Sequence, residues 1–387
     1  TESNNNRQTY TFGGSAYDIF NPVLSNNFDN NRVIHRTGAK LIYEVKKYKI
    51  SIGSNFRNVH QENLNVTTGQ KMSLDVNNVL PLASFNYRIN QGSNLQIYYN
   101  TSSQQPDLQQ MQPVIDNTDP NRITIGNPNL KPTFNNNASL NYYFYKGISD
   151  VNFYSGFNAG AVSRQISYAT SYDSLGKAVS QPVNINGNYN SSFYLGGGFP
   201  VFKRFMKIYY SLNGEHSNSV SMVNGVRNVS QNSGLTPGLQ FEKNIPDKFY
   251  IMIGGNYTYS RPKSDISVQS NQPYYSYSLE GNMTIKLPKK FSVTAEGNYT
   301  NNGNRTPGYN LNYFILNGSV NKTFFKTENL IVSFIANDIF NQNISNKRFI
   351  SSNQIVDTKT QIIKRYFLLK VVFKFNSQKT KEGDGDE

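Results

Sequence analysis

The sequence predicts an all-β protein, an antiparallel meander of strands that closes into a transmembrane β-barrel. Three observations support this fold class. Apolar and polar residues alternate along nearly the whole chain of 387 residues, several alternating segments are ten residues or longer, and the connections between segments alternate between short and long. About fifteen such segments lie between Arg36 and Phe375. Because successive side chains of a strand point to opposite faces, each segment has one apolar and one polar face.

The length of the alternating segments favours a membrane barrel over a soluble β-protein. A strand that crosses a membrane needs about 9–11 residues, whereas strands of soluble proteins have mostly about 5–6. One face of the strands should therefore contact lipid and the other should line the lumen. The residues expected to contact lipid include Leu279, Met283, Val293, Phe334, Phe367 and Leu369, and those expected in the lumen include Ser278, Asn282, Thr294, Glu296 and Lys370.

The connections between the segments predict how the barrel is oriented. Outer-membrane barrels have short periplasmic turns and longer external loops. Tyrosine and phenylalanine with flanking lysines cluster beside the short turns, as in an aromatic girdle at one membrane interface. The short turns lie near 46–47, 91–93, 146–147, 202–204, 246–248, 288–290 and 326–328, and the long loops near 59–69, 104–131, 170–180, 219–229, 261–271, 302–309 and 340–358.

Composition excludes several other classes of protein. Aromatic residues make up 13% of the chain and charged residues 16%, which argues against disorder. The net charge of +14 is scattered and forms no basic run, so we expect no nucleic-acid partner. There is no cysteine, and His35, His60 and His216 are not at metal-ligand spacing. Because no catalytic or phosphate-binding motif occurs, we expect neither an enzyme nor a cofactor.

The barrel is expected to occupy residues 1–375. A further strand near Thr9–Gly13 would give about sixteen strands in all, an even number as in most single-chain barrels. Residues 376–387 form a polar segment that we expect to be a disordered tail.

Several segments carry a resemblance to a known family. Residues 126–132 read GNPNLKP, followed by an amphipathic aromatic strand, and resemble the GNPxLKPE segment of TonB-dependent outer-membrane receptors. Residues 105–113 with Asp116 and Asn117 resemble the same region of the related outer-membrane β-barrel protein family. Residues 337–341 and 365–375 resemble the end of the penultimate strand and the last strand. One departure is Thr133, where glutamate is usual.

The resemblance implies the C-terminal barrel portion of a receptor in the outer membrane of a Gram-negative bacterium. Such receptors have 22 strands around a plugged lumen, and this chain has room for about sixteen. Its partners would then be the lipid bilayer, TonB and a plug domain outside this segment. The implied function is uptake of a ligand on energy relayed by TonB. Two alternatives remain open, a passive porin-like channel and a surface barrel that acts in adhesion or assembly without transport.

The 104–131 loop is the longest and is expected on the external side, so it is the candidate ligand site. It mixes hydrogen-bonding groups with apolar residues, which suits a lid over a ligand. The alternative is that it only packs against its neighbours and launches the next strand. Tyrosines in the lumen could extend the site inward. The candidate ligand contacts are Gln109, Gln110, Asp116, Asp119, Arg122, Tyr98 and Tyr209.

Overall fold

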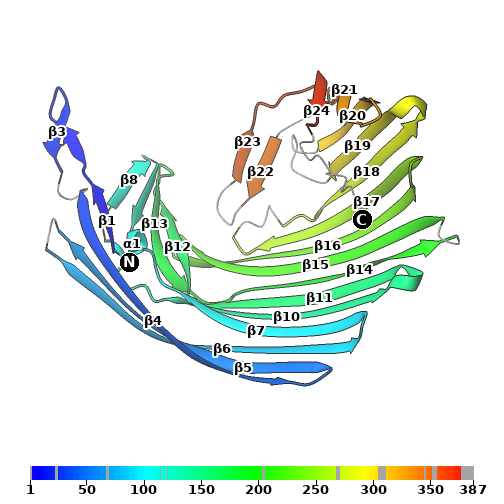
Figure 1. Cartoon of the computed structure of the whole chain (residues 1–387). Coiled ribbons are helices and arrows are strands. Elements are labelled where there is room, and N and C mark those ends of the chain that lie inside the picture. Colours follow the sequence, from blue (N-terminus) through cyan, green and yellow to red (C-terminus); the bar gives the residue numbers. More distant parts are fainter. Residues whose placement is uncertain are drawn as a thin grey trace, which may run out of the picture.

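One 20-stranded sheet dominates the computed structural model of the chain. Figure 1 shows this sheet curved into a trough, with β4 and β24 on its opposite sides. This confirms the all-β class predicted from the alternation. The structure describes residues 2–21, 25–66, 69–113, 115–119, 121–202, 205–266, 271–303, 311–343, 346–350 and 355–375. The predicted tail at 376–387 therefore lies outside the described residues.

Fifteen strands of the sheet form a continuous antiparallel meander, in which each strand pairs with the next one in the series. Several are longer than a membrane crossing requires. They are β4 (Asn26–Glu44), β5 (Tyr48–Asn65), β6 (Lys71–Asn90), β7 (Ser93–Gln104), β10 (Thr133–Lys146), β11 (Val151–Ser163), β14 (Asn188–Val201), β15 (Met206–Val223), β16 (Val226–Ile245), β17 (Phe249–Ser264), β18 (Tyr274–Leu287), β19 (Phe291–Gly303), β20 (Leu311–Phe324), β21 (Leu330–Asn337) and β24 (Tyr366–Phe373).

Shorter elements lie outside this meander. They are β1 (Glu2–Arg7), β2 (Tyr10–Phe12), β3 (Tyr17–Phe20), α1 (Leu108–Met111), β8 (Ile115–Asp119), β9 (Arg122–Ile125), β12 (Gln165–Tyr172), β13 (Ala178–Ile185), β22 (Asn346–Ile350) and β23 (Ile355–Lys359), with one-turn helices at Gly147–Ser149 and Pro288–Lys290. None of the helices in the described part of the chain is long and apolar enough to cross a membrane.

The strand expected near Thr9–Gly13 does not join the wall. β2 and β3 pair with each other in a separate hairpin. With three and four residues, these strands are too short to cross a bilayer. Instead, β1 pairs with the first residues of β4.

The register separates an apolar face from a polar face, as the alternation predicted. Val293 pairs with Val320, Val320 with Phe334 and Phe334 with Leu369, so these residues form a row on one face. Leu279 and Leu369 are 55% and 67% exposed, as expected of side chains that meet lipid. On the opposite face, the register pairs Asn282 with Glu296, Thr294 with Ser319 and Ser333 with Lys370.

The predicted short turns join strands at one end of the meander, and the long connections lie at the other (Figure 1). Parts of these connections, 203–204 and 304–310 among them, lie outside the described residues. Two predicted long loops, 59–69 and 219–229, are mostly strand. β5 continues to Asn65, and β15 and β16 are joined by Asn224 and Gly225 alone, which have φ values of 50° and 75°. Asn-Gly supplies the two positive φ angles that a tight hairpin turn requires.

The orientation can be tested by labelling single cysteines in this cysteine-free chain. We expect cysteine at Leu175, which is 92% exposed, or at Asn224 to react with an impermeant maleimide on intact cells, because both lie at the long-connection end. Cysteine at Lys289, in a short turn, should react only after the outer membrane is permeabilised. The reverse pattern would contradict the orientation.

Candidate functional site

The connection between β7 and β10 is anchored by buried side chains. Met111 at the end of α1 and Leu130 are each 2% exposed. The backbone N–H of Asn127 donates to the carbonyl of Gln110 at 2.7 Å, and its side-chain amide donates to the carbonyl of Pro182 at 3.0 Å. The GNPNLKP segment therefore holds this connection together and fixes it to the neighbouring connection.

Gly126 allows the close approach on which this packing depends. A Cβ atom at this position would overlap the backbone carbonyl of Gln112. Gly126 itself is buried, so the overlap could be relieved only by moving the backbone. The glycine of the motif thus has a steric role.

The connection between β11 and β14 packs beside the first one (Figure 1). β13 pairs in parallel with β9, with Ala178 opposite Arg122. Asn184 accepts a hydrogen bond from the backbone N–H of Lys131 at 2.7 Å and donates to the carbonyls of Lys131 and Arg164, both at 2.8 Å. The sequence did not point to Asn184, because only the fold brings these segments together.

The five candidate contacts on the 104–131 loop have different local roles. Gln110 accepts a hydrogen bond from the backbone N–H of Asp107 at 3.0 Å, so it caps α1. Asp119 accepts from the backbone N–H of Asn121 at 2.9 Å within the β8–β9 hairpin.

Gln109 and Arg122 are exposed, and Asp116 pairs with Thr124 in the same hairpin. The exposed side chains that could contact a ligand are thus carried on an anchored connection.

The two candidate tyrosines lie on the polar face, as predicted, but away from that connection. The hydroxyl of Tyr98 donates to the side chain of Asn86 at 3.1 Å. Tyr209 lies near the short-turn end of β15, where it pairs with Gly198. A Cβ on Gly198 would lie 2.6 Å from the Tyr209 ring, so the ring covers this glycine. The structure therefore does not bring the seven candidate residues into one site.

A depression on the polar face of β4–β7 was not anticipated from the sequence. It has a volume of about 460 Å³ and is lined by Arg36, Thr37, Gly38, Asn55, Arg57, Leu80, Ser102 and Ser103. None of the seven candidate residues lines it. Its two arginines lie directly opposite each other on neighbouring strands. The sequence signal that could have found it is arginine and lysine on the polar face of a strand, at Arg36, Lys40 and Arg57.

The apolar face ends within β5 and β6, towards the long connections. Phe56 and Val79 are paired and are 46% and 62% exposed. Asn58 and Asn77 follow on the same face and are joined by a hydrogen bond of 2.8 Å. The outer edge of the apolar belt therefore lies between these two residue pairs.

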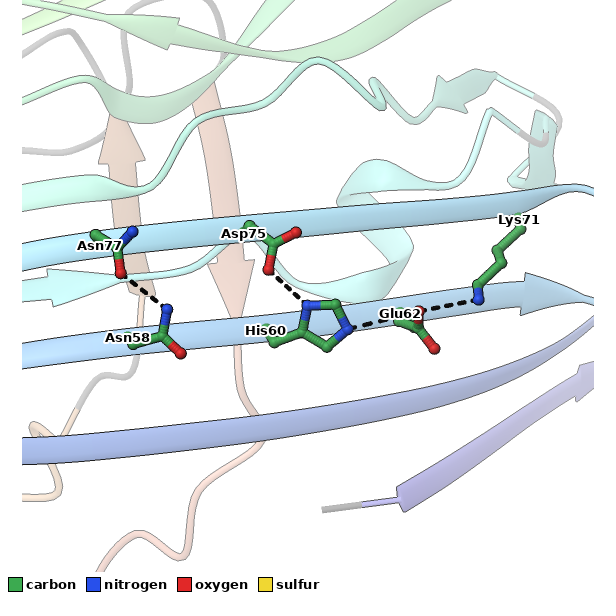
Figure 2. Close-up of polar contacts among 6 residues, drawn as sticks. All are labelled: Asn58, His60, Glu62, Lys71, Asp75 and Asn77. Atoms are coloured by element: carbon green, nitrogen blue, oxygen red, sulfur yellow. Dashed lines mark hydrogen bonds and ion pairs between the residues drawn. The ribbon is translucent and has the colours of Figure 1, made fainter.

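Beyond that edge lies a group of charged side chains (Figure 2). His60 contacts Asp75 at 2.5 Å and Glu62 at 3.5 Å, and Lys71 contacts Glu62 at 2.9 Å. The hydrogen bond with Asp75 raises the pKa of His60 above its ordinary value, and the hydrogen bond from Lys71 lowers the pKa of Glu62. Such charges suit a surface in water, so this part of the wall stands outside the bilayer.

Comparisons with solved structures give weak likenesses. A FadL homologue from Pseudomonas aeruginosa is 7% identical, with a TM-score of 0.27 over 96% of this chain and 85% of that chain. OmpT, an outer membrane protein of Vibrio cholerae, is 9% identical, with a TM-score of 0.26 over 76% of this chain and 96% of that chain. These scores are too low to support an argument about fold or function. No curated protein matches the sequence.

Sequence comparison with known families gives a match over nearly the whole chain. The outer membrane protein beta-barrel family matches residues 1–258 and 221–373. This agrees with the meander, the two-faced strands and the alternation of short and long connections. The chain therefore belongs to the outer membrane protein beta-barrel family and is a β-barrel protein of the outer membrane of a Gram-negative bacterium.

Proposed function

We propose that the chain forms part of the barrel wall of a TonB-dependent receptor that takes up a ligand across the outer membrane. The observation that carries the proposal is the packed layer formed by the 105–132 and 164–187 connections. This layer contains the GNPNLKP segment, whose Gly126 and Asn127 anchor it. In this proposal the wall belongs to a 22-stranded barrel, and TonB and the plug domain lie outside the present segment.

The proposed site has an outer and an inner part. The exposed groups Gln109, Asp119 and Arg122 at the long-connection end make the first contacts with ligand. The ligand then passes along the polar face, where hydroxyl and amide groups such as those of Tyr98 and Asn86 replace its hydration. Binding sites combine a rigid scaffold with loops that carry specificity, and the anchored connection meets both needs.

A passive channel is the second candidate, because a polar inner face also suits a water-filled lumen. The two functions differ in their need for energy. Diffusion through a channel follows the concentration gradient, whereas a TonB-dependent receptor takes up ligand only when TonB is present. Loss of TonB therefore distinguishes them.

The test uses the nutrient that cells fail to use when this protein is deleted, identified on a panel of carbon, iron and cobalamin sources. We expect a strain without TonB to show the same growth defect, since uptake requires the relayed energy. Removing residues 107–122 from the full-length protein should also abolish this growth, while a heat-modifiable barrel remains in the outer membrane. Normal growth without TonB would favour the channel. Normal growth after the removal would exclude the connection from the mechanism.

A further inference from the structure

Two arginines oppose each other on the polar face of the wall. Arg36 of β4 and Arg57 of β5 are direct partners in the antiparallel register, so their side chains leave the sheet on the same face. Like charges directly opposite each other destabilise a strand pair. Among the described residues, neither arginine forms an ion pair. Their mutual repulsion is therefore not offset by a carboxylate of the described chain.

Hydrogen-bond donors next to this pair also lack acceptors. Arg57 donates through Nη1 to the carbonyl of Ser103 at 2.5 Å, but its buried Nε has no hydrogen-bond partner among the residues that the structure describes. Asn78, which pairs with Arg57 in the register, is 7% exposed, and its Nδ2 likewise has no partner in the described part of the chain. Buried donors without an acceptor cost stability. Arg36, Arg57 and Asn78 thus form a row across three strands that combines positive charge with hydrogen-bond donors lacking an acceptor.

Arg36 and Arg57 of this row line the depression of about 460 Å³. A Cβ at Gly38 would overlap the side chain of Asn55, so the glycine leaves room for this amide in the wall of the depression. Asn55 and Ser102 add polar groups, and Leu80 adds an apolar surface. The volume is larger than a single ion needs, which fits a small organic molecule that carries an anionic group.

We propose that this depression binds an oxyanion group, a phosphate or a carboxylate, of a small molecule inside the barrel. A planar guanidinium group can bind either anion through two parallel N–H donors. An anion between Arg36 and Arg57 would remove their repulsion, and the depression would hold the rest of the molecule. The site is on the lumen wall, so the inference requires a barrel but does not depend on TonB.

The test measures binding of two probes, inorganic pyrophosphate and citrate, to the full-length protein in neutral detergent at low salt. Isothermal titration calorimetry should detect binding of at least one probe. Arg36→Gln and Arg57→Gln should each weaken it about 10- to 100-fold, the range expected when a hydrogen bond to a charged group is lost. Arg57→Lys should also weaken binding. Lysine keeps the positive charge, but it lacks the two parallel N–H donors of the guanidinium group. Heat-modifiability on gels checks that each variant is folded.

Lys370→Gln is the matched control. Lys370 lies on the polar face of β24, opposite Ser333, and is not among the residues that line the depression, so this substitution removes one positive charge without touching it. The Lys370→Gln variant should bind the probe with the same affinity as the unchanged protein. Selective binding of pyrophosphate would assign a phosphate site, selective binding of citrate a carboxylate site, and binding of both recognition by charge. Binding of neither probe, or equal weakening by Lys370→Gln and Arg36→Gln, would overturn the proposal.

Discussion

Ile253→Arg should destabilise the folded barrel by about 2–4 kcal/mol, the cost of arginine at the lipid-facing midplane of a membrane barrel. Ile253 is 60% exposed on the apolar face, in a row with Phe241 and Gly281. It lies four residues from the short-turn end of β17, deep enough for lipid to surround the new charge. Urea titration of the protein in lipid vesicles, followed by gel mobility, measures the change in the free energy of unfolding.

Met252→Arg is the control for that prediction. Met252 is the preceding residue of the same strand, but it lies on the polar face, where the register pairs it with Glu242 and Asn282. Arginine there can contact water and a carboxylate, so we expect a much smaller loss of stability. Equal destabilisation by the two substitutions would show that the two faces of the wall have been assigned incorrectly.

Gly126→Ala should loosen the connection between β7 and β10 without unfolding the barrel. The added Cβ would overlap the carbonyl of Gln112, and forced overpacking costs typically about 1–3 kcal/mol. Trypsin cleavage after Arg122 reports this loss, because β9 is held by its pairing with β13. Cleavage that requires local opening should become about 5- to 150-fold faster, in proportion to the open population.

Gly281→Ala is the matched substitution for comparison. The nearest atom to a Cβ on Gly281 is the carbonyl oxygen of Met252, at 3.9 Å, which is an ordinary contact distance. We expect the rate of cleavage after Arg122 to remain unchanged in this variant. If Gly126→Ala also leaves that rate unchanged, the glycine is not what anchors the connection.

The fold was predictable because membrane strands repeat a simple pattern. The alternation of Val293 with Thr294 or of Leu279 with Ser278 already assigned these side chains to the faces on which the register places them. The prediction was wrong where both faces of a strand are polar. In the second half of β15, His216 and Asn218 stand on the face that is apolar earlier in the strand, and Ser217 and Ser219 stand on the other, so the pattern there resembles that of a loop. The Asn224–Gly225 turn was nevertheless visible in the sequence.

The candidate site was much less predictable. The long connection was identified by its length, but length does not reveal that Gln110 caps a helix or that Asp119 closes a hairpin. Arg36 and Arg57 are 21 positions apart in the sequence, and only the register of β4 and β5 makes them neighbours. Residues close in the sequence therefore favour the loop as the candidate site, whereas the residues of the depression are brought together only by strand pairing.

The longest strands have a consequence for what the cell presents to its surroundings. β16 has 20 residues, enough to extend about 68 Å. At a tilt of about 45°, the height that such a strand spans along the membrane normal is roughly twice that of the apolar band, which is about 25 Å. The charged group at His60 and Lys71 lies on such an extension, on its outward face. In the expected orientation, strand as well as loop is therefore exposed above the bilayer, and the sequence of this raised rim is not constrained by contact with lipid.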